Sequence, residues 1–257
     1  MSPNEILAIL CIVSFFAMLA IGIPVALTLA VSGLVFGYLG FGSLLFNLLP
    51  SRIFGVVTNQ TSGKPQPGAT VTLYKLGGAG METVESVKSG ADGRFTVSVI
   101  EGGPYLLSVT DASNRTWYSY AAGAGTAHLT PLTTLALLQA NGNRPLADLL
   151  ANWATSRLTD AQVLEAAKVV NANLASVMQS RGVAATSTNV FNASFSANGQ
   201  GLDAVLDALR VSIACTASAC TQTITNPAGQ VVVTWNASIA TNGYTVSWSG
   251  GGSSGTV

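Results

Sequence analysis

Residues 92–99 run Asp92-Gly93-Arg94-Phe95-Thr96-Val97-Ser98-Val99. After the Asp-Gly pair, apolar side chains alternate with hydroxyl side chains, which is the period of a strand that buries one face. An Asp-Gly pair beside such a run indicates a hairpin turn, because both central positions of that turn favour positive φ. The sequence therefore predicts a tight turn at Asp92 and Gly93 and a strand from Phe95 to Val99.

The same alternation recurs on both sides of this strand. Val71 and Leu73 alternate with threonines, and residues 105–109 alternate in the same way. Stretches rich in Gly and Pro separate the runs and are typical of turns. Several short strands at this spacing predict an antiparallel β-sandwich, which we assign to residues 53–112.

Four motifs between about residues 54 and 110 resemble the carboxypeptidase regulatory-like domain, a prealbumin-type β-sandwich of bacterial exported proteins. They are Gly55-Val56-Val57, Pro67-Gly68-Ala69-Thr70-Val71-Thr72-Leu73, Asp92-Gly93-Arg94-Phe95 and Gly103-Pro104-Tyr105-Leu106-Leu107-Ser108-Val109. The resemblance implies the sandwich fold. For function it implies a non-catalytic spacer or binding module.

The N-terminal part of the chain carries no charge between Glu5 and Arg52. A membrane-spanning helix needs about 20 apolar residues, and this run is more than twice as long. Proline interrupts the i to i−4 hydrogen bonds of a helix, so Pro24 predicts either one helix kinked there or a pair of helices. We therefore expect residues 1–50 to form a transmembrane helical segment.

Residues 1–59 resemble the N-terminus of the large permease subunit of TRAP-type dicarboxylate transporters. The resemblance rests on Glu5-Ile6-Leu7-Ala8, Gly22-Ile23-Pro24-Val25-Ala26-Leu27, Ser32-Gly33-Leu34-Val35-Phe36-Gly37 and Leu49-Pro50-Ser51-Arg52-Ile53-Phe54-Gly55. Such permeases continue with many more membrane helices, whereas no apolar run of spanning length follows Asn59.

Beyond the sandwich, the hydrophobic period changes twice. Leucines at helical spacing predict a helical region over 126–210, in which Thr159 and Gln162 form a capping box. Strand character returns over 211–248, and residues 249–257 read as a flexible Gly/Ser tail. The predicted fold class is thus a membrane α-helical segment followed by an α+β soluble part. That part comprises an antiparallel β-sandwich, an Ala-rich helical bundle and C-terminal β-strands.

Two of the three cysteines, Cys215 and Cys220, are separated by four residues within the predicted C-terminal strands. This spacing suits a disulfide across a hairpin, and two unrelated thiols are the alternative. A metal site is disfavoured because no second cysteine pair or nearby histidine completes four ligands. A disulfide would place this part of the chain in an oxidising compartment.

Catalytic candidates are few. His128 is the single histidine, and its position at a loop-to-helix junction favours a structural role. Residues 251–255 match the Gly-x-Ser-x-Gly pattern but lack the strand and helix that would present the serine. Asp203 and Asp207 are spaced i, i+4; a catalytic carboxylate pair is one interpretation, and we favour stabilisation of both charges by the helix dipole. We therefore predict no catalytic, cofactor or metal site, and no enzyme.

The low charge of the chain disfavours nucleic acid as a partner. Charged residues make up 9% of the chain and the net charge is zero, so no basic excess exists to neutralise phosphates. We predict a membrane-anchored extracytoplasmic protein with a binding or structural, adhesion-like role. It would sit in the bacterial inner membrane, with the lipid bilayer and an envelope protein or polysaccharide as partners and no nucleic acid. The alternative is a permease fragment fused or mis-joined to an exported protein.

Overall fold

The computed structural model describes residues 3–41, 51–59, 63–77, 80–99, 102–110, 115–155, 157–240, 243–250 and 253–256. The chain divides into two compact units, Met1–Ser51 and Arg52–Val257.

The first unit is a pair of helices, α1 (Pro3–Ala20) and α2 (Val25–Phe41), which pack against each other. The chain turns between them at Gly22, whose φ of 88° is readily adopted only by glycine, and α2 starts directly after Pro24. Within α2, the Ser32 hydroxyl donates to the carbonyl oxygen of Thr28 over 2.7 Å, so this polar group is satisfied locally.

The prediction of a transmembrane segment, and with it an inner-membrane location, is wrong. Among the described residues no helix combines the length and apolar character that crossing a bilayer requires. The reason is the break between Gly22 and Pro24, which divides the uncharged run into helices of 18 and 17 residues. At about 1.5 Å per residue these measure about 27 and 26 Å, short of a hydrocarbon core of about 30 Å. The first helix also begins with polar Asn4 and Glu5. Residues 42–50 of the run lie outside the described residues.

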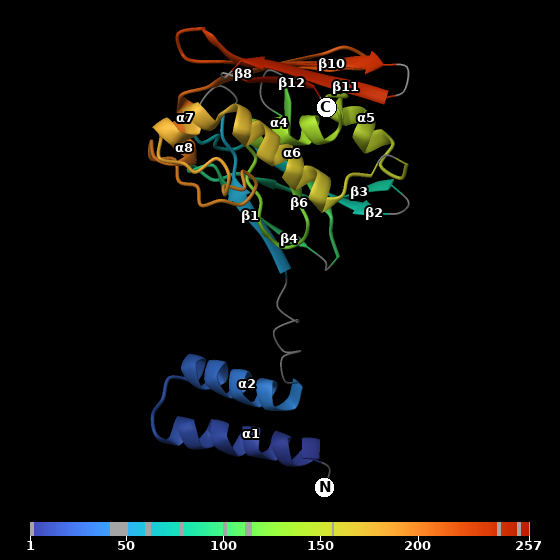
Figure 1. Cartoon of the computed structure of the whole chain (residues 1–257). Coiled ribbons are helices and arrows are strands. Elements are labelled where there is room, and N and C mark those ends of the chain that lie inside the picture. The colour runs from blue at the N-terminus through green and yellow to red at the C-terminus, as the bar shows by residue number, and fades with distance from the viewer. Residues whose placement is uncertain are drawn as a thin grey trace. The chain divides into compact units, whose positions relative to one another are not determined.

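The second unit contains a β-sandwich of two sheets (Figure 1). One sheet has the strand order β3-β2-β5-β6 and is antiparallel. Its strands are β2 (Thr70–Gly77), β3 (Gly80–Lys88), β5 (Tyr105–Thr110) and β6 (Thr116–Ala121). The other sheet has the order β4-β1-β7, with strands β1 (Ser51–Val56), β4 (Arg94–Val99) and β7 (Gly125–Thr126).

The alternation that predicted the sandwich is also its packing pattern. In β4 the apolar residues Phe95, Val97 and Val99 are buried while the residues between them are exposed. The turn at Asp92–Gly93 has positive φ only at Gly93 (74°), and it connects strands of different sheets, β3 and β4, rather than a paired hairpin. The sheets also include β6 and β7, which lie beyond the predicted limit at residue 112.

Helices follow the sandwich and pack on it, with α4 (Pro131–Ala140) against β6 and α6 (Asp160–Asn173) against α4. The predicted capping box of Thr159 and Gln162 starts α6. The other helices among the described residues are short: α5 (Leu146–Ala151), α7 (Ala175–Ser180) and α8 (Leu202–Asp207).

The C-terminal strands form one antiparallel sheet in the order β12-β11-β10-β9-β8. They are β8 (Arg210–Cys215), β9 (Cys220–Thr225), β10 (Val231–Ala240), β11 (Gly243–Gly250) and β12 (Ser253–Thr256). Residues 253–256 pair with β11 as a strand, where the sequence predicted a flexible tail.

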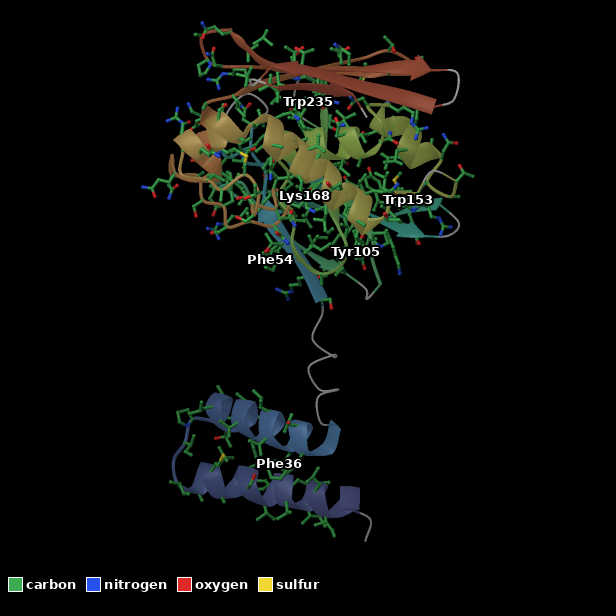
Figure 2. All side chains as sticks on the ribbon, viewed as in Figure 1. Phe36, Phe54, Tyr105, Trp153, Lys168 and Trp235 are labelled. Carbon is green, nitrogen blue, oxygen red and sulfur yellow. A yellow bond between two sulfur atoms is a disulfide. The ribbon has the colours of Figure 1, made fainter. Side chains whose placement is uncertain are left out.

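This sheet lies over the helices on the side away from the sandwich (Figure 1). Trp235 on β10 is fully buried, and its side chain lies between the sheet and the helical layer (Figure 2). The helices are therefore covered on two sides, which explains why segments as short as six residues persist: burial rather than propensity stabilises them.

Candidate functional site

A cavity of about 560 Å³ lies where β6 and α4 meet β8 and β9. This volume is within the range of about 300–1,000 Å³ that is typical of ligand sites. Consecutive residues line it on two strands, Arg115–Tyr118 at β6 and Arg210–Ile213 on β8. Each of these strands is the last in its sheet, so the cavity lies between two sheet edges.

The edge of β6 is partly closed by α4. The N–H of Tyr118 donates to Oγ1 of Thr134 over 2.9 Å, and the hydroxyls of Thr133 and Thr134 donate to the Tyr118 carbonyl oxygen over 3.0 and 3.1 Å. Both backbone groups of Tyr118 are thereby satisfied without a neighbouring strand. A further strand could not pair with β6 at this point.

The edge of β8 is different. The N–H of Cys220 donates to the carbonyl oxygen of Asn143 over 2.6 Å and therefore points away from its cross-strand partner Cys215. Pairs alternate along an antiparallel ladder between those that exchange hydrogen bonds and those that do not. The backbone groups of Cys215, Ile213 and Val211 consequently face outward, and all three residues line the cavity.

The polar lining is basic and rich in hydroxyls. Arg115 and Arg210 both contribute, and no carboxylate is among the described residues that line the cavity. Nη1 of Arg210 donates to the carbonyl oxygens of Leu209 (2.7 Å) and Asp207 (3.1 Å), which fixes the guanidinium group at the start of β8. Thr116, Ser212, Thr223 and Thr225 supply the hydroxyls. A lining of this kind suits an anionic or hydrogen-bonding ligand.

Two aromatic residues of β6 complete the wall. Trp117 is 5% exposed, and its Nε1–H has no acceptor among the described residues. Burial raises the pKa of the half-buried Tyr118, and nearby Tyr74 raises it further, so this hydroxyl remains protonated at neutral pH. The apolar floor comes from Leu138 of α4 and Leu146 of α5.

The predicted cysteine pair lies on the other side of the cavity, at the turn between β8 and β9. Cys215 and Cys220 form a disulfide across the β8–β9 hairpin, with Cys215 exposed and Cys220 fully buried. Gln222 of β9 is buried too, and its Nε2 donates to Oδ1 of Asn143. The disulfide and the bonds to Asn143 hold the hairpin that carries the open edge.

His128 does not line this cavity, and both of its ring nitrogens are engaged in structural contacts. Its Nδ1 accepts the N–H of Val56 (3.3 Å), so Nε2 carries the proton and donates to the carbonyl oxygen of Ala193 (2.9 Å). The ring also contacts Phe195, with 5.6 Å between ring centroids. Burial lowers the pKa of His128, and the bond to Ala193 opposes this only in part. The arrangement connects β1 to the loop before α8.

The two aspartates bind loops rather than each other. Asp203 is 4% exposed, and its Oδ2 accepts the N–H of Gly199 over 2.6 Å. Asp207 is exposed, and its Oδ1 accepts the N–H of Gly63 over 3.0 Å. Burial raises the pKa of Asp203, the bond from Gly199 opposes the shift, and the charge of Asp207 adds to it.

The remaining sequence candidates do not meet at a site. Pro24 ends the turn between α1 and α2, and Asp92 forms an exposed ion pair with Arg94 (3.1 Å). In the Gly-x-Ser-x-Gly stretch, Gly251 and Gly252 lie outside the described residues. Within the described ranges, no cluster of three or more His, Cys, Asp or Glu side chains is placed to hold a metal ion.

Sequence reasoning missed Arg115 and Arg210, the two cations of the cavity. They are 95 positions apart, Arg115 directly before β6 and Arg210 on β8 of another sheet, so no local spacing relates them. The one available signal was that each arginine directly precedes a β-rich run, Thr116–Ala121 or Val211–Cys215.

Comparison with known proteins identifies one part of the chain. Residues 52–132 match the carboxypeptidase regulatory-like domain. Nothing in the comparisons supports the resemblance of residues 1–59 to a TRAP-type permease subunit. No curated protein matches the chain. Among solved structures, a 9R-lipoxygenase from Cyanothece PCC8801 is similar at 12% identity, with a TM-score of 0.24, over 51% of this chain and 23% of the lipoxygenase chain. A similarity at this TM-score assigns neither fold nor function.

Proposed function

We propose that this chain is a binding protein of the exported type, without catalytic activity, and that its ligand occupies the cavity between β6 and β8. The carboxypeptidase regulatory-like sandwich of residues 52–132 supports a non-catalytic role. The Cys215–Cys220 disulfide supports action in an oxidising compartment, because disulfides are rare in reducing ones.

One observation carries the proposal: the cavity combines hydrogen-bond donors on β8 with apolar side chains from the helices. Arg210 is held in place by two backbone carbonyls, Ser212 follows two positions later, and Leu138 of α4 lines the same cavity. Binding sites typically join a mainly apolar surface to a few fixed polar groups in this way.

The positions of the titratable groups support binding over catalysis. Both ring nitrogens of His128 are committed to backbone partners, so the ring has no lone pair or proton available for substrate. Asp203 and Asp207 fix the Gly199 and Gly63 loops, and neither lines the cavity between β6 and β8. The zero net charge disfavours nucleic acid, so we propose an envelope polypeptide or polysaccharide as the partner.

The test is ligand screening with a blocked cavity. The full chain is applied to an array of bacterial polysaccharides and to a random peptide library displayed on phage. Ser212→Trp places an indole at the cavity wall, whereas Thr221→Trp places one on exposed β9 outside the cavity. We expect Ser212→Trp to abolish binding and Thr221→Trp to retain it. Equal binding by both variants, or no ligand in either screen, would contradict the proposal.

A further inference from the structure

We infer that the ligand of this cavity is an extended acidic polypeptide segment that adds to β8 as a sixth strand of the C-terminal sheet. This inference rests on the proposed binding function and names the chemical class of the ligand.

The backbone of β8 carries the inference. Its outward N–H and C=O groups recur at every second residue, Val211, Ile213 and Cys215, and all three residues line the cavity. An unpaired strand edge is a template for another strand, and main-chain hydrogen bonds supply the affinity when a peptide is added. Positions two residues apart on a strand are separated by about 6.6 Å, which matches the repeat of an added strand.

The opposite wall restricts where the added strand can pair. Tyr118 of β6 has both backbone groups bonded to Thr133 and Thr134. A segment in the cavity therefore pairs with β8 and contacts β6 only through side chains. Trp117 and Tyr118 lie in that wall, and their side chains are what a ligand segment meets on this side.

The side chains of β8 determine the composition of the ligand. Cross-strand neighbours project from the same face of a sheet, so an added residue beside Arg210 or Ser212 shares their polar face. Guanidinium groups prefer carboxylates, and no carboxylate is among the described lining residues, so glutamate or aspartate is favoured there. Val211 is buried and Ile213 packs against the core, so the alternate ligand residues face apolar surface and are β-branched or aliphatic.

The inference predicts the outcome of selection from the random peptide library. Enriched peptides should alternate acidic with aliphatic residues. A synthetic copy of the most enriched peptide should lose about tenfold or more in affinity for Arg210→Ala, the loss expected for one charge-assisted contact. Arg181→Ala removes an exposed arginine that does not line the cavity and is the matched control, with unchanged affinity expected.

Backbone pairing is tested separately on both partners. Ile213→Pro removes an outward N–H from β8, and proline is tolerated at such edge positions. Because a proline substitution can also impair folding, the same peptide is synthesised with N-methyl groups on alternate amides, in both registers, and offered to the unaltered protein. We expect one N-methyl register to abolish binding and the other to preserve it.

The outcomes separate this inference from the proposed function. Peptide binding that survives both N-methyl registers would overturn strand addition. Selective binding of an acidic polysaccharide, blocked by Ser212→Trp, would also overturn it while leaving a binding function at the cavity intact. If Ser212→Trp and Thr221→Trp behave alike with every ligand, the proposed function itself fails.

Discussion

The backbone nitrogen of Cys220 lies 2.6 Å from the carbonyl oxygen of Asn143. Its N–H donates to that oxygen, and this bond joins the C-terminal sheet to the turn after α4. Asn143 is fully buried and has a φ of 56°, in the left-handed region that asparagine tolerates better than most residues. Its Oδ1 also accepts Nε2 of Gln222. One residue thus holds β9, and through it the open edge of β8, against the helices.

Substitution of Asn143 should destabilise the chain by two separable effects. Asn143→Ala leaves Gln222 buried without an acceptor and places alanine at positive φ, so we expect a loss of about 2–4 kcal/mol in the free energy of unfolding. Asn143→Gly removes only the side-chain bond and should cost less, because glycine adopts positive φ without strain. Urea denaturation of the three proteins measures both effects. Equal stability of the two variants would show that the backbone conformation contributes nothing.

The Cys215–Cys220 disulfide closes a short hairpin, so its contribution should be modest. The chain-entropy estimate for a loop of this size is about 2 kcal/mol. We expect a Cys215→Ser/Cys220→Ala double variant to lose about that amount in urea denaturation, with alanine placed at the buried position. Dithiothreitol should lower the stability of the natural protein to a similar level and leave the double variant unchanged. If dithiothreitol also lowered the unfolding free energy of the double variant, its effect on the natural protein could not be assigned to the Cys215–Cys220 disulfide.

Gly55 is required where β1 runs beside β7. A Cβ atom at this position would lie 2.0 Å from the carbonyl oxygen of Ala127 and 2.9 Å from Cε1 of Phe95. Gly55→Ala should therefore force the two strands apart and cost about 3 kcal/mol, the upper end of the range for overpacking. Gly123→Ala adds the same methyl group where no atom lies within 4 Å, and should change little. Thermal unfolding followed by circular dichroism compares the two, and similar melting temperatures would contradict the clash.

The sandwich core could be predicted from sequence because its signal is local. Phe95, Val97 and Val99 alternate with exposed neighbours, and burial follows the same alternation. Strand β3 was missed because its residues are mostly exposed and include Glu82, Glu85 and Lys88. Only Val84 and Val87 pack partly against the core, which is too weak an alternation to mark a strand.

The membrane prediction failed on helix length: the sequence indicated a kink or a helix pair at Pro24, but neither helix of the pair is long and apolar enough to cross a bilayer. Gly22 and Pro24 end one helix and start another, which halves the usable length. The cavity could not be predicted because its walls, β6 and β8, are brought together only by the helices between them. The position of the β8–β9 hairpin against the helices depends on the bond from Cys220 to Asn143, a contact between residues 77 positions apart.

His128 should make stability depend on pH. The ring is buried and neutral, and burial lowers its pKa from the ordinary value of 6.5. As the pH falls through about 6.5, the unfolded chain binds a proton at this histidine while the folded chain does not. The stability contributed by the neutral ring is therefore fully present above this pH and is lost as the pH falls toward the folded pKa.

The comparison with His128→Gln isolates this effect. Asp203 has a raised pKa, so its contribution has the opposite sign and is lost as the pH rises above about 3.8. Because both proteins retain Asp203, the difference between their unfolding free energies reports the histidine alone. We expect His128→Gln to be less stable than the natural protein at pH 8, because a glutamine cannot reproduce both ring bonds and the contact with Phe195. The gap should narrow steadily below about pH 6.5. A gap that stays constant from pH 8 to pH 5 would mean that protonation of His128 is not coupled to unfolding.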